Sequence, residues 1–408
     1  MENEVKILIL GAGVYQVPLI VEAKKRGYRT FVASIKGDYP GFALADKVFY
    51  VNTTDKDAIL EIAEEEQINA ITTTGTDVAI ISIGFVNSNM HLNGISYSSA
   101  RILTDKALMK EAFIRGGVTT ASFFCISTYL EAVEASEMLG YPIVLKIVDK
   151  SGSRGITIID KEDQLKDTYE HAKSLTGSDY MVVEKFVNGV EIGIDAIVQN
   201  GQLIMVMPHG KYMYKTDRNA IPLGHYCPMD CSKKLYSNIV NETKKIIKTT
   251  GLDNCAINID AFVLPDDSLS VIEAAGRCGA TGIPEVISGY TGKNYYGYIL
   301  DIALGVNIPK MEVNEGIPTA SILLNSSQGG ILEKLRYVYD GKEYVNENLY
   351  IENMAKINID TNPGKPVKPF CNGADRLGMA VMSSGTVDSL HKKVEDFRKS
   401  IEVKIYKK

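Results

Sequence analysis

The sequence predicts a chain of mixed α/β and α+β architecture, and two patterns lead to this prediction. In the first hundred residues apolar runs alternate with helix-like segments, as in Val5–Leu10, Pro18–Gly27 and Ala58–Glu66, which is typical of a doubly wound sheet. From about residue 143 to 275 short turns join the apolar runs instead, which indicates antiparallel strands. At 408 residues the chain is too long for one hydrophobic core, so we expect two or three structural units.

The composition excludes several classes of protein. The chain is 45% hydrophobic and 23% charged, with a net charge of -6, as in ordinary soluble proteins. A nucleic-acid partner is not expected, because phosphate binding normally needs a basic excess. No apolar run reaches the roughly 18 residues that span a membrane, and the acidic start is unlike a secretory signal. The six cysteines form no CxxC pair. We therefore expect a cytoplasmic protein with reduced thiols.

The first strand-to-helix turn, Gly11–Gln16, resembles a dinucleotide-binding fingerprint. It has Gln16 where a third glycine would allow close packing of helix on strand. We interpret this segment as a tight turn of a Rossmann-like scaffold. A nicotinamide-dependent oxidoreductase that uses Gly11–Gln16 is the alternative from another class.

A lysine and a glycine-containing loop form the first candidate site. Lys146 lies in the apolar run Ile143–Ile147, and the small-residue loop Ser151–Gly155 precedes a second apolar run. A loop between two strands is not a P-loop, but its backbone N–H groups could still surround phosphate oxygens. Lys146 should be largely buried, so it needs an anionic or acceptor partner. The alternative is a snorkelling lysine beside an ordinary glycine turn.

Two glutamates flank the next chain reversal. Glu184 ends one apolar strand, Asn188-Gly189 indicates a turn, and Glu191 begins the next strand. A carboxylate suits the two hydroxyls of a ribose, and backbone groups at a strand end suit the edge of an adenine. Taken alone, the pair is better interpreted as two solvated surface glutamates.

A hairpin with two opposed acids is the most informative feature. The loop Pro265–Ser268 joins two apolar strands, and pairing Leu264 with Leu269 would place Asp260 opposite Glu273. Their Cβ atoms would then lie about 4.5–5.5 Å apart on one face. Directly opposed like charges destabilise a sheet, so a cation between them is expected, and oxygen ligands favour Mg²⁺ or Mn²⁺. The alternative is a different register or two solvated acids.

Arg277 follows the second acid by four residues, within a glycine-rich segment. A guanidinium beside a metal could hold a carboxylate or stabilise charge on a transferring phosphoryl group. It could equally form a structural ion pair.

In the order of these motifs the chain resembles the ATP-grasp superfamily, in the branch with biotin carboxylase, purine-pathway ligases, carbamoyl phosphate synthase and L-amino acid ligases. The resemblance covers nearly the whole chain. It implies a Rossmann-like pre-ATP-grasp domain at 1–103, a two-lobed ATP-grasp domain at 104–310 with a lid subdomain at about 117–188, and a small α+β subdomain at 311–408.

The resemblance also implies ATP and Mg²⁺, or Mn²⁺, as cofactors. It assigns Asp260 and Glu273 to the metal and Arg277 to catalysis. The family usually has asparagine at the position of Ala275, so one metal position is expected and a second is left open. The residues implied to bind the nucleotide are Lys106, Lys146, Ser151, Gly152, Ser153, Gly155, Glu184, Lys185, Val187 and Glu191.

The implied activity is that of an ATP-dependent carboxylate–amine ligase, which makes an acyl phosphate, lets an amine attack it, and releases ADP and phosphate. We expect a small-molecule carboxylate and amine, a homodimer, and substrate contacts from Lys211 and Arg218 in the loop after the Gln202–Met207 strand. One alternative is an ATP- and bicarbonate-dependent carboxylase of the purine or biotin type. Another is a catalytically silent ATP-binding regulator, to which Ala275 points.

Overall fold

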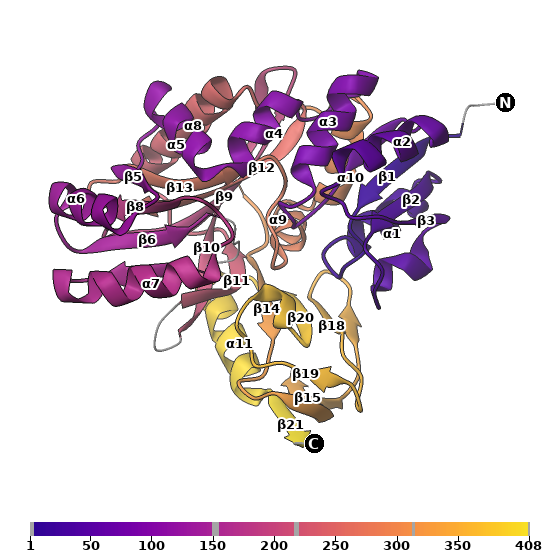
Figure 1. Cartoon of the computed structure of the whole chain (residues 1–408). Helices are drawn as coiled ribbons and strands as arrows, with labels where there is room; N and C mark the ends of the chain where they lie inside the picture. The colour runs from indigo at the N-terminus through magenta and orange to yellow at the C-terminus, as the bar shows by residue number, and fades with distance from the viewer. Residues whose placement is uncertain (1–3, 149–154, 216–219, 312–314, 407–408) are drawn as a thin grey trace.

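The computed structural model describes residues 4–148, 155–215, 220–311 and 315–406. These residues form four β-sheets with helices packed on them. In Figure 1 an N-terminal unit, a lid unit and a C-terminal unit surround one large central sheet. Within the described part of the chain, no helix is both long and apolar enough to cross a bilayer.

The N-terminal unit is a doubly wound parallel sheet, as the sequence predicts. Its strands lie in the order β3-β2-β1-β4, and all three pairings are parallel. Helices that cover a sheet on both faces bury its strands, which explains the continuous apolar run of β1. The elements are β1 (Lys6–Leu10), α1 (Val17–Lys25), β2 (Arg29–Ser34), β3 (Lys47–Tyr50), α2 (Lys56–Glu66), β4 (Ala70–Thr72), α3 (Ile80–Met90) and α4 (Tyr97–Thr104).

The lid unit is a four-stranded antiparallel sheet with order β5-β8-β6-β7. Ile143, Leu145 and Ile147 point to one face, where two helices cover them. Strand alternation therefore directs Lys146 to the opposite face. The elements are β5 (Phe123–Ile126), α6 (Tyr129–Leu139), β6 (Ile143–Ile147), β7 (Ile156–Ile159), α7 (Leu165–Leu175) and β8 (Met181–Lys185).

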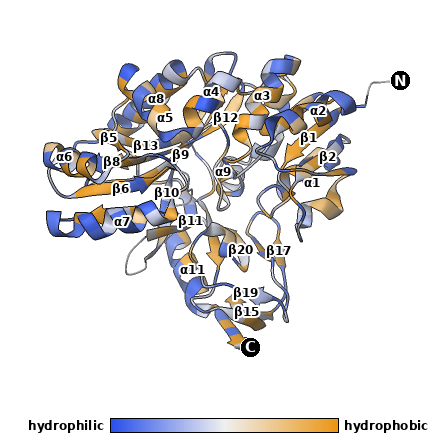
Figure 2. Ribbon diagram, in the orientation of Figure 1, coloured by the Kyte–Doolittle hydropathy of each residue, from blue (hydrophilic) through white to orange (hydrophobic). Residues whose placement is uncertain are grey.

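The central sheet has nine strands in the order β13-β12-β9-β10-β11-β14-β20-β18-β17. Apolar residues of its first strands pack on α5 and α8 in one core, and Figure 2 shows that strands are largely hydrophobic whereas α2 and α7 are mixed. The Asn200-Gly201 turn has positive φ at both residues, as a tight hairpin requires. The elements here are α5 (Lys106–Arg115), β9 (Val190–Gln199), β10 (Gln202–Lys215), β11 (Ala220–Cys227), α8 (Lys233–Thr250), β12 (Cys255–Val263), β13 (Leu269–Ala275), α9 (Ile283–Thr291) and α10 (Tyr295–Ala303).

The β12–β13 hairpin pairs Asp260 with Glu273, but its loop register differs from the expected one. Val263, and not Leu264, is the partner of Leu269. A bulge beside Asp260 places one extra residue on β13 and restores the expected pairing beyond it. The predicted loop pairing was therefore wrong by one residue, whereas the opposition of the two acids was right.

The C-terminal unit extends the central sheet and adds a second sheet. Tyr226 and Cys227 of β11 pair with Ala320 and Thr319 of β14. The second sheet has the order β16-β15-β19, and β21 also pairs with β15. Both sheets share one apolar core with α11. The elements are β14 (Thr319–Leu324), β15 (Gly330–Tyr339), β16 (Lys342–Val345), β17 (Leu349–Ile351), β18 (Ala355–Ile359), β19 (Pro366–Val367), β20 (Gly378–Ser383), α11 (Val387–Ser400) and β21 (Glu402–Tyr406).

The predicted α/β and α+β class is thus confirmed. Domain limits at 103/104 and 310/311 stay predictions, since strands from both sides of the second limit share one sheet.

The junction of β11 and β14 makes a testable prediction. A Cβ atom on Gly224 would lie 1.9 Å from the carbonyl oxygen of Ser321, so Gly224→Ala must push two strands apart. We expect the free energy of unfolding, measured in urea, to fall by about 2 kcal/mol. Gly385→Ala is the control, because a Cβ there meets no atom within 4 Å. Equal stability of the two variants would contradict this account of the junction.

Candidate active site

One face of the central sheet carries polar side chains at its middle. On β9, Ile192 and Ile194 pack in the core under α8, so alternation turns Glu191, Gly193 and Asp195 to the other face. In this row Gly193 is the register partner of His209 on β10 and of Asp260 on β12. A Cβ on Gly193 would lie 2.0 Å from the His209 ring. The glycine is therefore needed to make room on this face.

Lys211 joins two of the predicted ligand residues. Its Nζ lies 2.5 Å from Oε1 of Glu191 and 2.7 Å from Oδ1 of Asp260, and its side chain is 3% exposed. Burial alone would lower the pKa of Lys211, but Asp260 and Glu191 raise it above the ordinary value. The ammonium is therefore charged, and it links β9, β10 and β12.

Asp260 and Glu273 are register partners, and each is close to an ammonium group. Oε2 of Glu273 lies 3.4 Å from Nζ of Lys106, while Asp260 contacts Lys211. Two carboxylates that already attract cations suit a hard divalent ion. The described residues contain no cluster of three or more His, Cys, Asp or Glu side chains that could hold a metal.

Glu184 lies between two lysines beneath the lid sheet. Its Oε2 is 2.7 Å from Nζ of Lys146, and its Oε1 is 3.3 Å from Nζ of Lys110. Burial would raise the pKa of Glu184, but Lys146 and Lys110 lower it below the usual range. The expected anionic partner of Lys146 is therefore Glu184, and both side chains are buried. The interpretation of Glu184 as a solvated surface acid does not fit.

Lys110 was missed by the sequence reasoning. Its Nζ also donates to Oγ1 of Thr120 at 2.6 Å, and its side chain is 3% exposed. Burial lowers the pKa of Lys110 to about 8, although Glu184 opposes the shift. The available signal was its spacing, because Lys106 and Lys110 are four residues apart in α5 and lie on one helix face.

Lys185, Val187 and Gly155 are further residues predicted to contact the nucleotide. Nζ of Lys185 donates to the carbonyl oxygen of Gly140 at 2.8 Å, and Val187 is partly buried after β8. Gly155 has φ +75° and its carbonyl oxygen accepts from N–H of Ile147 at 2.8 Å. The predicted residues that lie outside the described ranges are Ser151, Gly152, Ser153 and Arg218.

Arg277 forms an ion pair with the N-terminal unit. Its Nε and Nη2 lie 2.8 and 2.9 Å from the two carboxylate oxygens of Asp77, and Nη1 donates to Oδ1 of Asn258 at 3.2 Å. Burial would lower the pKa of Arg277, but Asp77 raises it. The guanidinium is thus held at the edge of the polar face. Nothing in the sequence pattern singled out Asp77, which is 200 residues away.

Behind Arg277 the backbone loop is also tied to the polar face. Oδ1 of Asp195 accepts from N–H of Gly279 at 3.0 Å, and its Oδ2 accepts from Nδ2 of Asn258 at 2.8 Å. Thr281 has φ +57°, in the left-handed region that a β-branched residue rarely adopts. Such backbone conformations concentrate at functional sites.

The Gly11–Gln16 turn is closed by its own side chain. Oε1 of Gln16 accepts from N–H of Gly13 at 3.0 Å, and Nε2 donates to the carbonyl oxygen of Thr74. Gln16 is buried, so its side chain occupies the position where a third glycine would let the helix pack closely on the strand. This geometry supports the scaffold interpretation over a nicotinamide site.

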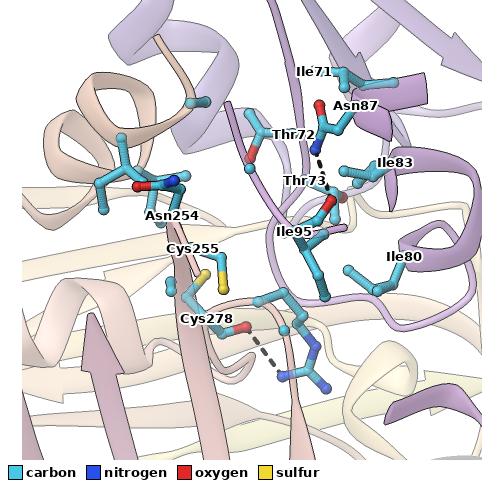
Figure 3. A pocket seen from close by; sticks show the side chains of 17 residues that line it. Ile71, Thr72, Thr73, Ile80, Ile83, Asn87, Ile95, Asn254, Cys255 and Cys278 are labelled. Carbon is cyan, nitrogen blue, oxygen red and sulfur yellow. Dashed lines mark hydrogen bonds between the residues drawn. The ribbon is translucent and has the colours of Figure 1, made fainter. Parts of the chain in front are cut away.

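A separate small cavity lies between the N-terminal unit and β12. Figure 3 shows Ile80, Ile83 and Ile95 lining it, with Asn87 and the thiols of Cys255 and Cys278. Its volume of about 40 Å³ suits a few water molecules and excludes a nucleotide. Among the described residues, buried Oδ1 of Asn87 has no hydrogen-bond partner, so a water there is expected.

Comparison with known proteins agrees with this arrangement. The ATP-grasp domain family matches residues 139–285. The chain is 24% identical to the L-arginine-specific L-amino acid ligase of Bacillus subtilis over 282 residues, 66% of this chain and 67% of that protein.

Two solved structures extend the likeness to the whole chain. The phosphoribosylglycinamide synthetase of Anaerococcus prevotii has a TM-score of 0.82 at 29% identity, covering 99% of this chain and 100% of that one. The biotin carboxylase domain of Hydrogenobacter thermophilus 2-oxoglutarate carboxylase, with MgADP, ADP and bicarbonate, has a TM-score of 0.79 at 17% identity, covering 98% and 90%. Residues 139–285 thus form an ATP-grasp domain, and the chain is an ATP-dependent ligase that forms carbon–nitrogen bonds.

Lys110 makes a prediction about pH. The folded pKa of about 8 lies below the unfolded value of about 10.4, so between these values the unfolded chain binds more protons and stability rises with pH. Relative to Lys110→Met, the free energy of unfolding of the wild type should increase by about 2 kcal/mol from pH 7.5 to 9.5. Urea unfolding of both proteins measures this. A difference that does not change with pH would contradict the prediction.

Proposed function

We propose that this chain is an ATP-dependent carboxylate–amine ligase that forms an amide or peptide-like bond through an acyl phosphate. The observation that carries the proposal is the opposition of Asp260 and Glu273 on the polar face, with the buried cluster of Lys146, Glu184 and Lys110 on the lid. In this arrangement the carboxylates can bind a metal ion and the lysines can bind phosphates, and a metal–nucleotide complex needs both. Two opposed acids would destabilise the hairpin unless cations lay against them, as Lys211 and Lys106 do here.

In this proposal Asp260 and Glu273 hold Mg²⁺ or Mn²⁺, which would neutralise charge on the phosphates of ATP. The nearby ammonium groups of Lys211 and Lys106 show that both carboxylates accept cations. Lys106, Lys146 and the Ser151–Gly155 loop are proposed for the phosphates. For the nucleoside we propose the segment from Glu184 through Lys185 to Val187 at the adenine and Glu191 at the ribose. The position of Ala275 leaves one metal position in the proposal.

The proposed ligase reaction has two steps. A substrate carboxylate oxygen attacks the γ-phosphorus of ATP, and ADP leaves. An amine next attacks the carbonyl carbon of the acyl phosphate, inorganic phosphate leaves, and the amine loses a proton. Arg277, which Asp77 and Asn258 hold by hydrogen bonds, would stabilise the charge that develops. The lid would exclude water from the acyl phosphate.

The likeness to an L-amino acid ligase favours an amino acid as one substrate, and Lys211 and Arg218 are proposed as contacts. The small-molecule carboxylate and amine, the homodimer and the cytoplasmic location belong to the same proposal. The second candidate is a bicarbonate-dependent carboxylase, which the likeness to the biotin carboxylase domain favours.

Phosphate release from ATP, screened against amino acids and small acids in pairs, tests this function. A ligase releases ADP and phosphate only when a carboxylate and an amine are both present, whereas release that depends on bicarbonate favours the carboxylase.

Asp260→Asn and Glu273→Gln should each lower turnover roughly 100-fold or more, because each removes the negative charge of a proposed metal ligand. Glu352→Gln, at an exposed residue, is the matched control. Tight NADH binding without ATP binding would contradict the proposal.

A further inference from the structure

Lys211 reaches across a strand to contact its second carboxylate. It lies on β10, its partner Asp260 lies on β12, and β9 runs between them. Of the β9 residues on this face, Gly193 lies next to Glu191, and it has no side chain to obstruct the lysine stem. Both carboxylates therefore converge on one ammonium group that is almost fully removed from water.

The two carboxylates held by Lys211 are those proposed for other ligands. In the proposed function Asp260 binds the metal and Glu191 binds the ribose hydroxyls. Without a nucleotide, the ammonium supplies positive charge to these two partly buried acids. A divalent ion at Asp260 would repel an ammonium 2.7 Å from the same carboxylate. The two cations should therefore compete for Asp260.

Two buried histidines lie near Lys211 on the same face of the sheet. His225 is its register partner on β11, and the rings of His225 and His209 are 4.8 Å apart. Among the described residues, Nδ1 of His225 and both ring nitrogens of His209 have no hydrogen-bond partner. Burial, together with His209 and Lys211, holds the pKa of His225 well below its usual range. In the tautomer with its proton on Nε2, the neutral imidazole of His225 offers an unused acceptor at Nδ1 to a displaced ammonium.

We propose that Lys211 is an internal counter-ion, which occupies the cation position of the site before a nucleotide binds. The arriving metal–nucleotide must displace the Lys211 ammonium toward His225. This inference rests on the proposed function and adds a positioning role for Lys211 before catalysis. The lysine keeps Glu191 and Asp260 ordered on the sheet, and the arriving metal and ribose take over its two partners. Nucleotide binding then frees the ammonium for a substrate carboxylate.

Binding of Mn²⁺ with ADP, measured by isothermal titration on the full chain, tests the displacement. Lys211→Met removes the competing charge, so its affinity for Mn²⁺·ADP should be about tenfold higher than that of the wild type. Lys211→Arg keeps a charged bridge with more donors, so its affinity should be several-fold lower. Lys106→Met is the control, because Lys106 is proposed to hold phosphates and its loss should weaken binding.

The sign of the change separates this proposal from a simpler role. If Lys211 only attracted the phosphates, Lys211→Met would weaken binding of Mn²⁺·ADP, and that result would overturn the displacement. Should Lys211→Met fail to fold, Lys211→Arg still decides, because unchanged or tighter binding contradicts competition. A wild type that binds neither ADP nor Mn²⁺·ADP would overturn the proposed function and this inference together.

His225→Phe tests where the ammonium goes. This variant removes the acceptor, so Mn²⁺·ADP affinity should fall several-fold in the wild-type background. It should change little when Lys211 is already methionine, because no ammonium is then displaced. An equal loss in both backgrounds would show that His225 acts through packing and would overturn the proposed destination.

Discussion

Lysine ammonium groups removed from water lie against carboxylates on both sheets of this site, because an unpaired buried charge is too costly to keep. On the lid, Lys146 and Lys110 share Glu184. On the central sheet, Lys211 is held by two acids. These clusters leave little freedom in how the strands align, since a shift by one residue would turn a charge into an apolar core. The pairing of buried charges therefore sets the geometry to which a nucleotide must adapt.

The same constraint connects the units of the chain. Arg277 follows the central hairpin, yet its carboxylate partner Asp77 belongs to the N-terminal unit. Tyr15, in the first turn of that unit, donates to the carbonyl oxygen of Gly373 in the C-terminal unit at 2.8 Å. Polar contacts from both ends of the chain thus meet near the polar face. Substrates that bind there would contact elements from all three units. For this reason no single sequence motif identifies the substrates.

Much of the fold and part of the site could be predicted from local patterns in the sequence. Strand alternation predicted that Asp260 lies opposite Glu273, and the structure has this pair because a bulge offsets the one-residue difference at the loop. The alternation of apolar and polar residues did not reveal the bulge that corrects the register. The expected burial of Lys146 also predicted an anionic partner for it. Only the tertiary structure shows which acidic residue is that partner. Glu184 lies 38 residues away on a neighbouring strand.

By itself the sequence determined the fold class, the hairpin with its two acids and the need for charged partners, because these follow from periodicity and from the cost of burying charge. The tertiary structure decided which charges meet. Lys110 joined Glu184, Arg277 joined Asp77, and Lys211 took the position expected for a cation. Such pairings depend on the three-dimensional crossing of strands and helices, which spacing along the chain does not encode.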